Sequence, residues 1–209
     1  MKSNILKYGG VAAAIVLIVF GIASIAIGAA GHNTVRNELS AQRISGTADM
    51  TPTAIKAEGT KAGLKNADYP TCSVAGQAID TGAKARCFGQ YMRIHTLEAT
   101  DNQVYAQMGR YLDHNGKATD NINAAAIDPK TKQPVANGLR DMWVTETALS
   151  TALNTSYFAE NVALFSIIMG IALLLTGTGL GILAFGLIPN RRHQHTTEPI
   201  TTSTHPATA

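Results

Sequence analysis

The sequence contains two long stretches with no charged residue. Asp, Glu, Lys and Arg are absent between Val11 and Ala30, and again between Glu160 and Arg191. At a rise of about 1.5 Å per residue, either stretch can cross a hydrocarbon core about 30 Å thick as a helix. A chain of 209 residues has too little other material to bury both helices in a soluble core. The sequence therefore predicts two transmembrane helices, at residues 9–31 and 160–188.

Positive charge flanks these stretches at their outer ends. Two basic residues precede the first stretch and two follow the second, namely Lys2, Lys7, Arg191 and Arg192. Cytoplasmic flanks of membrane spans collect Lys and Arg. We therefore expect a cell-membrane protein with both termini, residues 1–8 and 189–209, in the cytoplasm. Residues 32–159 would form an extracytoplasmic domain, and the Thr- and Pro-rich C-terminal tail would be disordered.

A cleaved signal peptide is an alternative interpretation of the first stretch. Ser24-Ile25-Ala26 has the small-x-small pattern of a cleavage site. The apolar run is longer than the 7–15 residues that a signal peptide usually contains. Cleavage would leave one span and an outer N-terminus.

The segment between the spans lacks the usual marks of nucleic-acid binding or catalysis. It holds thirteen of the 17 basic and twelve of the 14 acidic residues, so it has no excess positive charge to bind a phosphate backbone. No Gly-rich phosphate loop precedes a helix, and no nucleophile lies beside a base. His95 and Glu98, three residues apart on a predicted helix, are weak functional candidates, but they are too few for a metal site. We expect no nucleic-acid partner, no enzymatic activity, no catalytic residue, no metal and no cofactor.

Cysteine is scarce, with only Cys72 and Cys87 present. Both fall in the predicted outer domain, where disulfides persist. Their spacing closes a loop of about fifteen residues, which the chain-entropy model values near 3 kcal/mol. The spacing differs from the Cys-x-x-Cys of redox motifs, so we predict a structural disulfide.

Small residues recur inside both apolar stretches. Gly177 and Gly181 form a GxxxG pair, and Ser24 and Gly28 have the same spacing. Such faces let helices approach closely in a membrane. They are predicted helix-packing residues, and pairing of the two spans, a homodimer and docking on a larger complex all remain open.

The outer segment reads as helical but rich in loops. Helical periodicity continues from the first span to about Ser45, and Gly46 and Pro52 then end it. Residues 47–83 are predicted to be irregular, residues 85–100 helical, and residues 103–112 a second short helix. Asn115-Gly116 predicts a type I′ hairpin turn, and residues 120–138 are again irregular.

One long helix is predicted from Leu139 through the second span, because no proline occurs before Pro189. Its outer part has an apolar stripe, formed by Leu139, Met142, Leu149 and Leu153. We expect this stripe to pack antiparallel on the projecting part of the first helix. The predicted fold class is mainly α, with two transmembrane helices extended into a small helical, loop-rich extracytoplasmic domain.

Three stretches of this sequence resemble an actinobacterial family of small two-span membrane proteins without an established function. They are VRNEL at 35–39, HTLEAT at 95–100 with YAQM at 105–108, and TAL at 147–149 with TALN at 151–154. Some members of that family are labelled aromatic ring-opening dioxygenases. The sequence lacks the facial triad of two His and one carboxylate that such iron enzymes use. The cysteines, the segment 113–138 and the His-bearing tail depart from the family pattern.

These observations lead to two functional hypotheses. The first is a non-enzymatic accessory or scaffold subunit of a larger membrane complex, with the lipid bilayer and that complex as partners. The alternative is an envelope sensor or small-ligand-binding protein that uses the extracytoplasmic domain.

Overall fold

The computed structural model describes the backbone of residues 2–186 and the side chains of residues 7–186. It is mainly helical, as predicted. The elements in chain order are α1 (Lys2–Ala41), α2 (Pro52–Lys61), α3 (Gly82–Ala99), the 3₁₀ turn η1 (Tyr105–Gln107), β1 (Tyr111–Leu112), β2 (Ala118–Thr119), the 3₁₀ turn η2 (Ile122–Ala124) and α4 (Gly138–Gly186). The predicted tail and its arginine pair lie outside the described residues.

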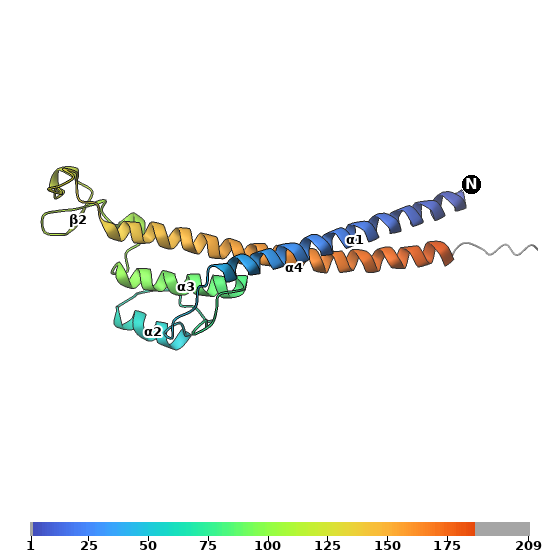
Figure 1. The fold of residues 1–209 in the computed structure, drawn as a ribbon, viewed down its shortest axis with the longest axis horizontal. Helices are drawn as coiled ribbons and strands as arrows, with labels where there is room; N and C mark the ends of the chain where they lie inside the picture. Colours follow the sequence, from blue (N-terminus) through green and yellow to red (C-terminus); the bar gives the residue numbers. More distant parts are fainter. Residues whose placement is uncertain (1, 187–209) are drawn as a thin grey trace, which may run out of the picture.

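The two longest helices form an antiparallel pair that extends along the molecule (Figure 1). Both α1 and α4 are long and apolar enough to cross a membrane. At the end of the molecule where α4 begins, α3 lies along the first half of α4, and α2 lies on the side of α3 away from α4 (Figure 1). The β1–β2 hairpin and the loops around it lie beside the start of α4.

A seven-residue repeat determines which faces of α1 and α4 meet. In α1 the most buried positions of the apolar part are Ala14, Gly21 and Gly28, and in α4 they are Ala163, Gly170, Gly177 and Ala184. Each set repeats every seven residues, which is the period of a left-handed coiled coil. Because every position in these sets is Ala or Gly, the two backbones come close together.

The segment 47–83, predicted to be irregular, contains the helix α2. Thr51 is its N-cap, and its side-chain oxygen accepts a hydrogen bond from the backbone N–H of Ala54 at 3.2 Å. Pro52 occupies the first helical turn, where its missing N–H costs nothing and its φ suits the helix. The proline that was expected only to end the first helix therefore begins the second, and the prediction for this segment was wrong in part.

The short helix predicted at residues 103–112 is absent. Asp101 and Asn102 both adopt a left-handed conformation, with φ of 51° and 59°, so the chain turns sharply after α3. The carbonyl of Gln103 then accepts a hydrogen bond from the Trp143 indole at 2.9 Å. Only the 3₁₀ turn η1 forms before β1. The Gln103 carbonyl thus accepts a long-range hydrogen bond from α4 instead of a backbone hydrogen bond within a helix.

The predicted hairpin forms, with Tyr111 opposite Thr119. A type I′ turn requires positive φ at both central residues, and here Gly116 has φ of 74° while Asn115 is not in that region. The Asp113 side chain instead accepts hydrogen bonds from the N–H groups of Asn115 and Lys117, both at 2.8 Å. The predicted turn type was therefore wrong, although the predicted position of the turn was right.

The apolar stripe of α4 faces both α1, as expected, and α3: Leu149 and Leu153 lie against Val35 and Leu39 of α1, and Leu153 also lies beside Gly89 of α3. Leu153 is buried there, whereas Leu139 and Met142 keep 41% and 40% of their surface exposed. A largely apolar groove of about 390 Å³ remains between the outer part of α1 and α4.

Candidate functional site

One face of α3 carries the chemically notable side chains of the loop-rich region. Cys87, Tyr91, His95 and Glu98 follow one another at intervals of four, four and three residues, so they share a face of the helix. Thr81 caps the start of α3 by accepting a hydrogen bond from Lys84 N–H at 3.2 Å. That face is turned toward α2 and the loops on either side of it, away from α4.

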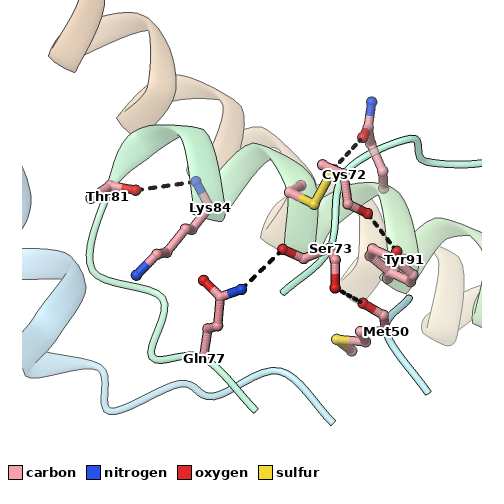
Figure 2. Close-up of a disulfide and its surroundings, with 9 residues drawn as sticks. Met50, Cys72, Ser73, Gln77, Thr81, Lys84 and Tyr91 are labelled. Atoms are coloured by element: carbon pink, nitrogen blue, oxygen red, sulfur yellow. Dashed lines mark hydrogen bonds between the residues drawn. A yellow bond between two sulfur atoms is a disulfide. The ribbon is translucent and has the colours of Figure 1, made fainter. Parts of the chain in front are cut away.

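Cys87 forms a disulfide with Cys72, as predicted, with the two Cα atoms 6.1 Å apart. Figure 2 shows the bond between α3 and the loop that precedes it. The Sγ atom of Cys72 also lies 3.6 Å from Oε1 of Gln90. A disulfide sulfur has no hydrogen to donate, so this approach is a contact and not a hydrogen bond.

The loop held by the disulfide is tied in turn to the segment that precedes α2. The Tyr91 hydroxyl donates to the backbone carbonyl of Cys72 at 2.6 Å. Ser73 Oγ and Val74 N–H both donate to the carbonyl of Met50, each at 3.2 Å. These links (Figure 2) connect Cys87 on α3 to the backbone beside Asp49. The disulfide therefore positions Asp49 as well as its own loop.

His95 lies between carboxylates from three segments. Its Nε2 is 3.2 Å from Asp49 Oδ2, and its Nδ1 is 3.3 Å from Glu98 Oε2. Glu58, on α2, contributes a third carboxylate, and single ligand atoms of Asp49, Glu58 and His95 all lie within 4.8 Å of one another. The side chains of His95, Asp49 and Glu98 are 28%, 33% and 22% exposed. We call these four residues the His95 cluster.

The surroundings of the cluster favour a charged Asp49. A hydrogen bond from the Thr47 side chain, its own backbone N–H and the nearby His95 together lower the pKa of Asp49, against the opposing effect of burial. The pKa of Tyr91 is raised, mainly by burial and also by the negative charge of Asp49. Tyr91 therefore stays a neutral hydrogen-bond donor beside an ionised carboxylate.

Sequence reasoning found only the α3 half of this cluster. His95 and Glu98 are recognisable because three residues on a helix bring side chains together. Asp49 and Glu58 precede His95 by 46 and 37 residues, on a loop end and on a helix that was not predicted. No sequence-spacing rule relates such positions to His95. They come close to His95 only because of the fold of the disulfide-held segment.

The predicted helix-packing residues lie mostly where α1 meets α4. A Cβ added to Gly28 would lie 2.6 Å from the carbonyl oxygen of Ala163, and one added to Gly177 would lie 3.0 Å from that of Ala14. Gly181 faces Ala14 at an ordinary contact distance, 3.7 Å. Ser24 is half-buried on α1. Gly21 and Gly170 were missed, although their seven-residue spacing from Gly28 and Gly177 would have identified them.

A polar layer closes the apolar part of this helix pair. Glu160 on α4 is buried, and its Oε2 accepts a hydrogen bond from the Gly82 N–H at the start of α3 at 2.7 Å. Its Oε1 lies 3.5 Å from Nδ1 of His32 on α1. A carboxylate at a helix N-terminus is favoured by the helix dipole. Glu160 thus joins three helices at one point.

A separate polar pocket of about 340 Å³ lies between α3 and α4. Arg86 and Arg93 line it from α3, and the buried Glu146 and the half-buried Ser150 line it from α4. The two guanidinium groups stack over the rings of Tyr157 and Trp143, at 4.9 and 5.3 Å from the ring centroids. The pocket and the His95 cluster lie on different faces of α3.

Comparisons with family models, curated proteins and solved structures found no match to this chain. The resemblance to the actinobacterial two-span family stays a prediction that rests on its short motifs. The fold defines a class only by its shape: a long antiparallel helix pair that carries a small disulfide-containing helical region.

Proposed function

We propose that this chain is a two-span protein of the cell membrane that acts through contacts and not through catalysis. In this proposal α1 and α4 cross the membrane, both termini are cytoplasmic, and the disulfide-containing region lies outside. It would serve as an accessory or scaffold subunit of a larger membrane complex. The disulfide supports the outer placement, because such bonds persist in oxidising compartments.

The continuity of α4 is the observation that carries the proposal. This helix runs for 49 residues from Gly138 to Gly186. With the membrane boundary near Glu160, its outer part would reach about 33 Å at 1.5 Å per residue. The hairpin region would therefore be held at a fixed height above the membrane, where it presents exposed apolar side chains: Tyr105, Ile122, Ile127, Leu139 and Met142. A rigid spacer with an apolar head suits a protein that contacts a partner.

The helix pair also supports retention of the first span. Cleavage near Ala26 would remove Ala14 and Gly21, and the α4 face around Gly170 and Gly177 would lose its cover. The same packing changes the expected role of the small residues. Gly28 and Gly177 face each other's helix within one chain, so a partner would bind through other surfaces.

Cross-linking of the tagged protein in its native membranes, followed by mild-detergent purification and mass spectrometry, tests this proposal. We expect one stoichiometric partner, cross-linked to the hairpin region. A matched variant, Ile122→Ser with Ile127→Ser, should lose the partner while its helical circular dichroism is unchanged. Recovery of the protein alone, or only with itself, would contradict an accessory role.

A small-ligand-binding role is the second candidate, because of the pocket between α3 and α4. Arg86 and Arg93 have no carboxylate within 4.0 Å among the described residues, so both can receive an anionic group. A thermal-shift screen of carboxylates and phosphates on the purified protein tests this. The ligand that stabilises the native protein should lose its effect in the Arg86→Gln and Arg93→Gln variants. If no carboxylate or phosphate in the screen raised the melting temperature, the ligand-binding hypothesis would be contradicted.

A further inference from the structure

We infer that the His95 cluster is a binding site for a divalent transition-metal ion, with Asp49, Glu58 and His95 as ligands and Glu98 as the residue that orients His95. This inference does not depend on the proposed contact function. It starts from the charge of the cluster. Three carboxylates converge on one imidazole, so the net charge is −2 even when His95 is protonated and −3 when it is neutral.

The charge is not balanced by the protein itself. Within the described residues, no Lys or Arg nitrogen lies within 4.0 Å of the carboxylates of Asp49, Glu58 or Glu98. Like charges held together in a partly desolvated place repel each other, and a divalent cation would remove that repulsion.

The imidazole is oriented as a metal ligand would be. A His that binds a metal through one ring nitrogen usually donates a hydrogen bond from the other to a carboxylate or carbonyl. Glu98 Oε2 lies 3.3 Å from Nδ1, so it can accept a hydrogen bond from Nδ1 when Nε2 binds an ion. Nε2 is the ring nitrogen on the side of Asp49.

The spacing of the three ligand atoms fits a small ion. Metal–ligand bonds of 2.0–2.1 Å in a tetrahedral site place ligand atoms about 3.3 Å apart. His95 Nε2 and Asp49 Oδ2 are already 3.2 Å apart. The Glu58 oxygen lies within 4.8 Å of both, so a small movement of its side chain would bring it to the same spacing.

The donor set selects the kind of ion. One imidazole nitrogen with two carboxylate oxygens suits Zn²⁺ or Mn²⁺, whereas Ca²⁺ and Mg²⁺ prefer oxygen ligands alone. Three protein ligands leave a further position, and the partial exposure of the cluster lets water fill it. The ion would link α2, the segment before it and α3, which are the segments that the disulfide also joins.

Zinc titration of the purified full-length protein in detergent, by isothermal calorimetry at pH 7.5, tests the inference. The protein carries a tag without histidine, and His193, His195 and His205 are replaced by Gln so that the tail cannot bind the metal. We expect one Zn²⁺ per chain, which Ca²⁺ does not displace and which Mn²⁺ displaces only in large excess, since Mn²⁺ binds such sites more weakly than Zn²⁺. Glu98→Gln should weaken binding about tenfold to a hundredfold, and Asp49→Asn, Glu58→Gln and His95→Gln should weaken it more.

His114→Gln is the matched control, because it removes an exposed hairpin histidine and should leave zinc affinity unchanged. Equal zinc affinity in the His95→Gln variant and in its parent would overturn the inference. The absence of zinc binding at zinc concentrations up to about 1 mM, which is the weak end of metal sites in proteins, would also overturn it. If a ligand variant fails to fold, imidazole ¹⁵N resonances of the parent protein decide. Zinc should shift the His95 resonance and not those of His32 or His114, and the reverse result would overturn the site.

Discussion

Gly21 of α1 and Gly170 of α4 lie directly opposite each other. A Cβ on Gly21 would come within 2.8 Å of the Gly170 carbonyl oxygen, and one on Gly170 within 2.7 Å of the Gly21 carbonyl oxygen. Real Cβ atoms do not approach so closely, so neither position accepts a side chain without separating the helices. The two glycines therefore mark a place where the α1 and α4 backbones are in close contact.

Gly170→Ala should destabilise the helix pair. The new methyl group would press on the α1 backbone and on Ile25, and overpacking of this kind costs about 1–3 kcal/mol. Gly179→Ala is the control, because nothing lies within 4 Å of that position and alanine favours a helix. Unfolding of both variants by SDS, followed by circular dichroism, measures the difference. Equal stability of the two would contradict the packing.

Glu160→Ala should loosen the start of α3. The buried N–H of Gly82 would lose its acceptor, and an unsatisfied buried donor costs about 1–3 kcal/mol. Glu160→Gln keeps an oxygen at that position and should cost less. Hydrogen exchange at the Gly82 amide is the direct measurement. Exchange should accelerate in Glu160→Ala but not in Glu38→Ala, which alters an exposed carboxylate.

Removal of the disulfide should destabilise the loop-rich region. Replacing both Cys72 and Cys87 by Ser frees a loop of 15 residues, with an expected loss of about 3 kcal/mol in the free energy of unfolding. Urea unfolding of the variant and of the reduced native protein should give the same value. A reducing agent should have no effect on the variant, and a native protein insensitive to reduction would speak against this role of the bond.

Asp49→Asn should lower stability at neutral pH and have little effect in acid. The pKa of Asp49 is lowered in the folded state, chiefly by the Thr47 hydrogen bond, so ionisation favours folding above the unfolded pKa of about 3.9. That contribution disappears as the pH falls through the lower folded pKa. Unfolding measured between pH 7 and 2.5 should show the wild type and Asp49→Asn converging below about pH 4. Asp68→Asn, at an exposed position, should show no such convergence.

A bound zinc ion would change how the stability of the wild type depends on pH, because the ion would compete with protons for Asp49. His95 and Glu58 face Asp49 and would share a bound ion with it. The pH series is therefore run in the presence of a chelator, so that only protons compete for the carboxylate. A difference between Asp49→Asn and wild type that persists unchanged at pH 2.5 would contradict the assignment of a lowered pKa.

The sequence by itself determined the long helices, because an uncharged run of this length and a chain without proline from Leu139 leave few other conformations. It also determined the disulfide, since only two cysteines are present. Its turn signals located the β1–β2 hairpin. The helix α2 was missed because Pro52 was taken as an end and not as a start, and the pattern around Thr51 is compatible with both.

Tertiary structure alone decided which surfaces meet. The stripe around Leu153 could have packed on any apolar helix, and the Glu160–Gly82 hydrogen bond is one of the contacts that hold α3 beside α4. The His95 cluster likewise depends on contacts between segments that are far apart in the sequence. Its carboxylates come from a loop end and a short helix far from His95 in sequence, and local propensities fix neither. They converge because Cys72, Tyr91 and Met50 tie those segments to one face of α3, and a long-range constraint of this kind leaves no periodic signal in the sequence.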